Sequence, residues 1–483
     1  MTPDVAVGPA GDVVVVWAQA DRATWTVDAV VRPAGGPWGP LQPLSTPAGS
    51  VASPRVALSG SNAAVVWVQS DGQNLIVQAC ERDLTTGAWT TQASLSAPGQ
   101  DAVAPRIAVD ARGDAVAVWG SDSLAGQSVE AAYRPAGGSW QTAVTLESGE
   151  AATPSPDVVL DADGNATAVW ASDTGSGWQV RAAHRGSDGT WSNAAALSGP
   201  TNAASVQPHL ALQGTGDVVA VWATPSGTAG TGTAVDLSTR DARTGRWTRQ
   251  QQLFTSAASL LAPLIVTDRR GDGLIVWTGS NSSGLNVSAL YRRKGGAWSG
   301  PRTLASSESG PFSPAVALDA SGNAIVDWAV FVNGTSRVQV SELNAGTAAW
   351  TRPKTLSRAG GDALTPQVAV GADGDGAAAW ARFNGAAFVV QAAGFDASGP
   401  ALSRVSIPST GIVRKRLVFS ISPKDNWSVV RSVRWIFGDG TSADGKVAGH
   451  AYGKPGRYAV RVTATDGFGH VATLRRFVTV GTR

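Results

Sequence analysis

Cysteine and histidine are scarce in this 483-residue chain. Its only cysteine is Cys80, and its four histidines are His184, His209, His450 and His470. A single cysteine excludes an internal disulfide framework and any zinc site built from CxxC pairs. Four histidines are too few to favour a multi-histidine metal centre. No P-loop, HExxH or dinucleotide-binding pattern is present either. We therefore expect no metal site and no cofactor.

Charged residues and long apolar runs are also few. Charged residues make up 15% of the chain, against about 25% in an average globular protein. This composition argues against a disordered or coiled-coil chain. No stretch approaches the roughly 18 apolar residues that would span a membrane, so we expect no membrane span. No signal peptide is visible at the N-terminus, and we expect one upstream of the printed sequence.

Tryptophan is what the sequence has in excess, with 19 residues against 10 phenylalanines and 4 tyrosines. In each repeat a tryptophan closes a short apolar run, as in VVVVW and AVAVW. These eight residues are Trp17, Trp67, Trp119, Trp170, Trp222, Trp277, Trp328 and Trp380. A second tryptophan follows in every repeat but the eighth. The sequence therefore contains eight repeats of about 51 residues, and we expect these tryptophans to be core residues.

Each repeat divides into four short apolar or alternating segments bounded by Gly, Asp, Asn or Pro. In the third repeat these are PRIAVD, AVAVW, SVEAAYR and SWQTAVTLE. Such segments predict β-strands, and no window shows helical periodicity. A four-stranded unit repeated eight times predicts an all-β fold, an eight-bladed β-propeller over residues 1–402. We expect the last strand of the eighth blade near residues 401–407.

The turn between the third and fourth strands contains GGxW, TGxW or, at residues 187–191, SDGTW. This turn partly resembles the Asp-box of sialidase-like propellers. The resemblance concerns the fold of residues 1 to about 402 and implies no active site, because the arginine motif of sialidases is missing.

Residues 403–483 do not continue the repeat. They contain WIFGDG (Trp435–Gly440), HAYGKPGRY (His450–Tyr458) and TATDGFG (Thr463–Gly469) in this order. This segment resembles a PKD domain, which implies a small Ig-like β-sandwich. Members of that family are usually spacers or adhesive modules of secreted or surface proteins. The resemblance implies a structural role for the motif residues and not a catalytic one.

Candidate ligand-binding residues follow the proline of each predicted inner strand. Because inner strands surround the central channel of a propeller, these positions should lie near one of its mouths. In repeat order they are Asp4, Arg55, Arg106, Asp157, His209, Leu264, Ala315 and Gln367. The first five are ionisable, and we predict that Asp4, Arg55, Arg106, Asp157 and His209 form a binding site. A solvated rim whose charges pair between blades is the alternative.

The loops after the first tryptophan of repeats one to four carry Asp21, Asp71, Asp122 and Asp173. Paired carboxylates across a cleft are what glycoside hydrolysis requires. Aspartate is also a common turn residue, and we assign no catalytic residue.

Charge is divided unevenly along the chain. Residues 401–483 hold 14 Lys and Arg against 4 Asp and Glu, a net charge of +10, whereas the preceding residues have a net charge of −8. A domain this basic is expected to attract anionic partners, and an anionic cell-wall polymer is our expectation. We expect no nucleic-acid partner.

The sequence thus predicts a monomeric, non-catalytic protein of the extracellular space or the cell surface. Its propeller is expected to bind a polysaccharide or a surface protein, with the PKD-like domain as spacer or attachment module. The alternative is a glycan-cleaving propeller hydrolase or lyase.

Overall fold

The computed structural model describes residues 2–21, 24–123, 126–149, 152–201, 207–226, 232–257, 259–281, 284–308 and 310–482. Every regular element in these ranges is a β-strand. Within them, no helix has the length and apolar character that crossing a membrane requires. The chain divides into two compact units. One comprises Met1–Arg32, Trp38–Ala372 and Gly376–Ala393, and the other comprises Pro33–Pro37, Asp373–Asp375 and Gly394–Arg483.

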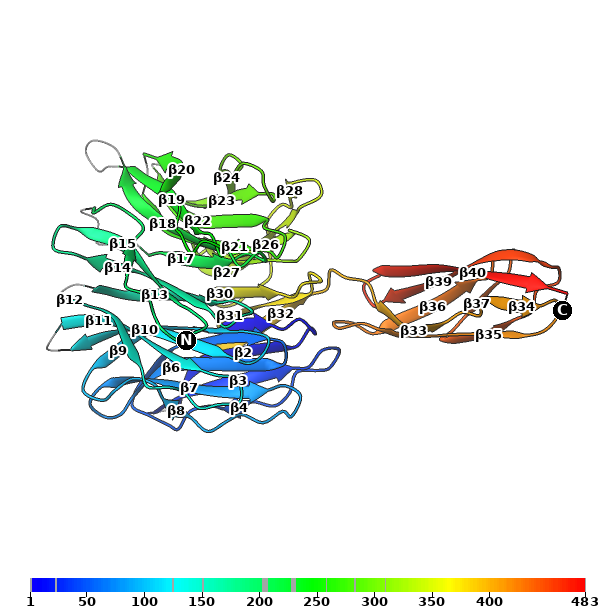
Figure 1. Ribbon diagram of the computed structural model, residues 1–483, viewed down its shortest axis with the longest axis horizontal. Helices are drawn as coiled ribbons and strands as arrows, with labels where there is room; N and C mark the ends of the chain where they lie inside the picture. Colours follow the sequence, from blue (N-terminus) through cyan, green and yellow to red (C-terminus); the bar gives the residue numbers. More distant parts are fainter. Residues whose placement is uncertain are drawn as a thin grey trace. The chain divides into compact units, whose positions relative to one another are not determined.

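The first four repeats each form one antiparallel four-stranded sheet whose strands follow in sequence order (Figure 1). The first two sheets are β1 (Asp4–Val7), β2 (Val13–Asp21), β3 (Thr24–Arg32), β4 (Gln42–Pro43), and β5 (Val51–Ser59), β6 (Asn62–Ser70), β7 (Leu75–Asp83), β8 (Ala93–Ser94). The next two are β9 (Asp101–Val109), β10 (Ala115–Ser123), β11 (Gly126–Arg134), β12 (Val144–Gly149), and β13 (Ala152–Leu160), β14 (Ala166–Asp173), β15 (Trp178–Arg185), β16 (Ala195–Ala196).

The fifth and sixth repeats continue this pattern, the seventh sheet has five strands, and the eighth has three among the described residues. The fifth and sixth sheets are β17 (His209–Leu212), β18 (Val218–Ser226), β19 (Gly232–Arg240), β20 (Gln251–Ser256), and β21 (Leu260–Thr267), β22 (Gly273–Asn281), β23 (Gly284–Arg292), β24 (Arg302–Ser307). The seventh is β25 (Pro311–Leu318), β26 (Ala324–Val332), β27 (Thr335–Asn344), β28 (Ala349–Trp350), with β29 (Lys354–Thr355) also paired to β27. The eighth is β30 (Ala363–Val370), β31 (Gly376–Phe383), β32 (Phe388–Phe395).

The eight sheets close into a ring. Each inner strand contacts the inner strands of both neighbouring sheets, and β1 contacts both β30 and β31 of the eighth sheet. The all-β, eight-bladed propeller is therefore confirmed. The eighth sheet differs in having three strands among the described residues. The sequence predicts its fourth strand near residues 401–407, but Ala401–Ser406 pairs instead with β35 (Leu417–Lys424) of the second unit. The second tryptophan, which precedes the fourth strand in the first six repeats and lies in β28 in the seventh, is missing in the eighth.

The propeller core lies between neighbouring blades. Trp67 packs against Val14 and Val16 of the preceding blade, and Trp119, Trp170, Trp222, Trp277 and Trp328 occupy equivalent positions in successive interfaces. Cys80 is fully buried in the first of these interfaces. The second tryptophans are not full core residues, since they are half-buried and Trp38 is 41% exposed. They lie near the outer edges of the blades, where less protein covers them.

The second unit is a β-sandwich. One sheet is formed by β33 (Ala401–Ser406), β35 (Leu417–Lys424) and β38 (Val447–His450). The other has the order β34 (Thr410–Ile412), β40 (Val471–Gly481), β39 (Gly456–Asp466), β36 (Val430–Ile436), β37 (Ser442–Asp444). Trp435, Phe437, Phe419 and Tyr452 are buried between the two sheets. Of the motif residues, Trp435 is therefore a core residue, while Tyr458 is only partly buried.

Candidate functional site: the central cavity of the propeller

A cavity of about 720 Å³ lies at one end of the ring of inner strands. All eight residues at the position after the inner-strand proline line it, namely Asp4, Arg55, Arg106, Asp157, His209, Leu264, Ala315 and Gln367. The structure therefore brings together the five ionisable residues that the sequence singled out. They meet because the same position of eight equivalent strands faces the same central space.

A β-bulge positions several of these side chains. In five blades the residue two before the cavity position is non-glycine with a positive φ, for example Ser53 at 52° and Ala104 at 48°. The pairing of β5 with β6 shifts at this point, between Ala52 and Arg55. A bulge bends its strand and re-aims the following side chain, and bulges often occur beside binding sites. The local backbone thus directs the cavity residues inward.

The two aspartates of the cavity each connect neighbouring blades. Asp4 Oδ2 accepts a hydrogen bond from the Val56 amide of the second blade at 2.9 Å. Asp157 Oδ2 accepts one from the Leu210 amide of the fifth blade, also at 2.9 Å. Since a buried amide without a partner is costly, both carboxylates have a structural task in addition to lining the cavity.

Asp157 also contacts His209, whose Nδ1 lies 3.4 Å from Asp157 Oδ2. Burial alone would raise the pKa of Asp157. The contact with His209, the positive charge of Arg106 and the Leu210 amide outweigh it and lower the pKa below its usual value. Asp157 is therefore ionised at neutral pH and is poorly suited to donate a proton.

Arg55 and Arg106 supply the positive charge of the cavity. Arg55 Nε is buried and has no hydrogen-bond partner among the described residues. Burial, and next the like charge of Arg55, lower the pKa of Arg106, while Asp157 and Asp4 act in the opposite direction. Guanidinium groups remain charged at neutral pH. Two adjacent cations therefore lie between Asp4 and Asp157, with donor capacity that their neighbours do not use.

The opposite half of the cavity is largely apolar. Blades six to eight contribute Leu261, Leu264, Ile265, Phe312, Pro314 and Val368. The sequence showed that these blades lack charge at the cavity position. It did not show that Phe312 and Leu261, from neighbouring positions of the inner strands, complete an apolar wall. The cavity thus offers a charged side and an apolar side to one ligand.

Of the aspartates considered for glycan hydrolysis, Asp71 and Asp173 are engaged in turns and Asp122 contacts its cross-strand partner. Asp71 Oδ1 accepts the amides of Gln73 and Asn74 at 2.8 Å. Asp173 Oδ1 accepts the amide of Gly175 at 2.9 Å, and Asp122 lies 3.5 Å from the side-chain amide of Gln127. The Asp21 side chain lies outside the described residues. Asp71, Asp122 and Asp173 do not line the cavity.

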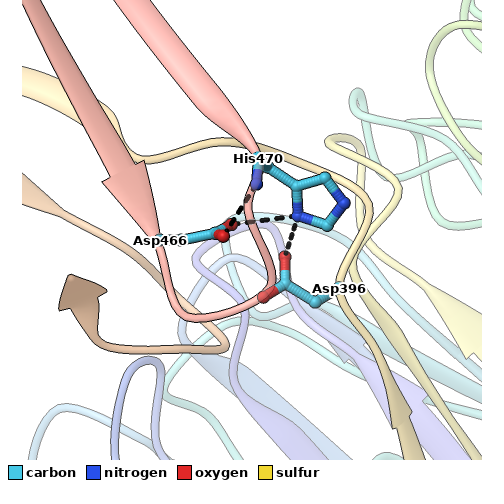
Figure 2. Close-up of side chains that lie close together, drawn as sticks. All are labelled: Asp396, Asp466 and His470. Carbon is cyan, nitrogen blue, oxygen red and sulfur yellow. Dashed lines mark hydrogen bonds and ion pairs between the residues drawn. The ribbon is translucent and has the colours of Figure 1, made fainter. Parts of the chain in front are cut away.

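A separate cluster in the second unit was not found from the sequence. Asp396, Asp466 and His470 each place a ligand atom within 4.8 Å of the others. His470 Nδ1 lies 2.9 Å from Asp466 Oδ2 and 3.4 Å from Asp396 Oδ1 (Figure 2). This spacing is compatible with a divalent cation, and the His470 imidazole contacts both carboxylates directly. Asp396 is distant in sequence, so no local motif indicated the cluster.

Comparison with known proteins adds a domain assignment. A family model described as PKD domain matches residues 400–480. The PKD1 domain of the Vibrio cholerae metalloprotease PrtV is 21% identical; the match covers 18% of this chain and 99% of that one, with a TM-score of 0.15.

Two solved structures resemble this chain at low sequence identity. One is an ulvan lyase of polysaccharide lyase family PL25, bound to -[GlcA(1-4)Rha3S]-, with 10% identity, coverage of 70% of this chain and 90% of that one, and a TM-score of 0.48. The other is a leech intramolecular trans-sialidase complexed with 2,7-anhydro-Neu5Ac, with 10% identity, coverage of 80% and 82%, and a TM-score of 0.39. The sequence motifs, the β-sandwich fold and the family model agree in the C-terminal segment, and residues 400–480 are therefore a PKD domain.

Proposed function

We propose that the propeller is a non-catalytic binding module for an acidic sugar, with the central cavity as its site. The observation that carries this proposal is the pair Arg55 and Arg106 on the cavity wall, with a buried Arg55 Nε that lacks a partner. Arginine forks match the geometry of carboxylate and sulfate groups. An oxyanion between the two guanidinium groups would also relieve their mutual repulsion.

The apolar half of the cavity supports a sugar rather than a simple ion. A pyranose ring has an apolar face of C–H groups and a polar edge. Leu264 and Phe312 offer a surface for the former, while the arginines take a charged substituent on the latter. A volume of about 720 Å³ lies within the roughly 300–1,000 Å³ typical of small-molecule sites.

Binding is favoured over cleavage because the cavity carboxylates are occupied. Asp4 and Asp157 hold backbone amides of adjacent blades, and the lowered pKa of Asp157 opposes a role as general acid. The PKD domain supports an extracellular or cell-surface location, where acidic polysaccharides are accessible.

The test is calorimetric titration of the full chain with short uronic-acid oligosaccharides and with neutral oligosaccharides of equal length. We expect binding of the acidic ligands only. Arg55→Gln and Arg106→Gln should each weaken it about 10- to 100-fold, the range for a lost hydrogen bond to a charged group. Arg269→Gln is the matched control, because Arg269 lines a separate hollow at the other ends of the inner strands.

Equal binding of neutral and acidic ligands, or equal losses in the Arg269 control, would contradict the proposal. Cleavage of the oligosaccharide that Asp157→Asn abolishes would instead establish the alternative, a glycan-cleaving enzyme.

A further inference from the structure

The outward face of the larger sheet in the PKD domain concentrates positive charge. On β39, Val460, Val462 and Ala464 are fully buried. Side chains alternate along a strand, so Arg457 and Arg461 point away from the core, and both are exposed.

Strand register brings further residues to the same face. Arg461 lies directly opposite Arg475 of β40, and Thr463 lies opposite both Thr473 of β40 and Arg434 of β36. Side chains of directly opposed residues share one face of a sheet. Four arginines therefore stand together on three adjacent strands. They are Arg434, Arg457, Arg461 and Arg475, which we call the arginine face.

Among the described residues, the arginine face has no ion-pair partner. Arg434 donates instead to the Ser442 hydroxyl at 3.3 Å. Arg461 and Arg475 are like charges directly opposite each other, and such pairs destabilise a sheet. Asp444 is the acidic residue paired in register with Arg434.

The other sheet of the sandwich provides a contrast. Its outward positions include Val418 and Ser420 of β35 and Val447 of β38, alternating with the buried Phe419 and Ile421. These three positions carry no charge, but Lys424 of β35 and Arg404 of β33 are exposed on the same sheet. The larger sheet thus carries four arginines on one face, whereas the strands of the smaller sheet carry two cations, Arg404 and Lys424.

We infer that the arginine face binds a linear polysaccharide bearing carboxylate or sulfate groups. The flat, extended surface suits a chain better than a compact ligand. Arginine forks hold such oxyanions in two-point contacts that lysine cannot make. Threonine hydroxyls between the arginines, including Thr463 and Thr473 at 3.2 Å from each other, are suited to sugar hydroxyls.

Nucleic acid is the other common polyanion, and Phe477 argues against it. Phe477 lies among the arginines and is 44% exposed. However, the Arg457 guanidinium lies 4.0 Å from its ring centroid and that of Arg475 lies 5.2 Å away. Single-stranded nucleic acids bind by stacking bases on free aromatic rings. Here the guanidinium groups of Arg457 and Arg475 lie over the Phe477 ring, so the ring is not free to stack on a base. The N–H groups at the edges of both guanidinium groups remain available to oxyanions.

The experiment measures retention of the full chain on immobilised polygalacturonate and dextran sulfate, with neutral dextran as reference. Arg461→Gln combined with Arg475→Gln should weaken retention about tenfold, given that exposed charge pairs each contribute a few-fold. Lys415→Gln with Lys446→Gln is the matched control, because it removes the same charge from exposed positions off the arginine face. We expect less than a twofold change there.

The salt dependence of retention and competition by other polyanions provide two further tests. Retention of the wild type should fall as salt rises from 0.05 to about 0.5 M, because screening shortens the range of exposed charges to a few ångströms. Arg269→Gln should leave polymer retention unchanged, because Arg269 lies outside both the arginine face and the central cavity. Equal losses in the two double variants would overturn the inference, as would retention on neutral dextran. Duplex DNA displacing the chain at lower concentration than the polysaccharides would also overturn it.

Discussion

Replacing Asp327 by valine is expected to stabilise the propeller at neutral pH. Asp327 lies in β26 with no solvent exposure, and neither carboxylate oxygen has a hydrogen-bond partner among the described residues. It is paired in register with Ala315, at the cavity position of the seventh blade. The residues equivalent to Asp327 in the first six blades are buried valines: Val16, Val66, Val118, Val169, Val221 and Val276.

Two effects set the magnitude. A buried polar group without a partner costs about 1–3 kcal/mol. In addition, burial raises the pKa of Asp327 well above its usual value; the nearby amides of Ala315 and of Asp327 itself, which lack full hydrogen-bond geometry to the carboxylate, oppose this only partly. Between pH ~4 and that raised pKa the native state keeps a proton that the unfolded state has lost. The wild type therefore loses about 1.4 kcal/mol of unfolding free energy per pH unit in that window.

The assay is urea unfolding of the full chain, followed by tryptophan fluorescence at pH 4.5 and pH 7. Asp327→Val should gain on the wild type at both values and gain more at pH 7. Asp327→Asn is the control, because it stays polar but cannot ionise, so it should lose the pH dependence without the apolar gain. The reasoning is refuted if the valine variant is less stable at pH 7, or if its advantage does not grow with pH.

Three further outcomes are expected. Trp119→Ala should lower the unfolding free energy of the propeller by about 3–5 kcal/mol, because Trp119 is fully buried, whereas Trp38→Ala at a 41% exposed position should cost far less in the same urea titration. Burial and then the positive charge of Arg240 lower the pKa of His184 to about 4. The free energy of unfolding should therefore fall as pH drops from about 6.5 to 4. In thermal melts, His184→Asn should remove this contribution to the pH dependence of stability. Cys80 is completely buried, and burial raises the pKa of its thiol; it should stay unreactive toward a thiol reagent until urea unfolds the chain, and rapid native-state labelling would show that the first blade interface opens.

The sequence predicted the ring and the cavity position because both follow from strict repetition. Equal spacing of the strand-closing tryptophans requires equivalent blades, and equivalent positions of inner strands must meet around the axis. The proline before Arg55, Arg106 and His209 marked that position.

Contacts between different repeats were not predictable in this way. The bond from the Val56 amide to Asp4 joins residues 52 apart, and no local pattern encodes it. Asp327 illustrates the same limit, since an aspartate in AIVDW does not reveal whether the neighbouring blade supplies a partner. The arginine face required strand register, because Arg461 and Arg475 are brought together only by the pairing of β39 with β40.

The closure of the ring affects how such a protein can evolve. Each blade is built from consecutive residues, and the first and eighth blades meet through side-chain and strand contacts without exchanging a strand. The boundary at which the chain enters the ring is therefore arbitrary. A circular permutant that joins the eighth repeat to the first and opens between two other repeats should assemble the same ring. A gene encoding it can likewise duplicate or exchange one repeat as a unit, and the Asp4–Val56 and Asp157–Leu210 bonds mark the junctions at which neighbours must still match.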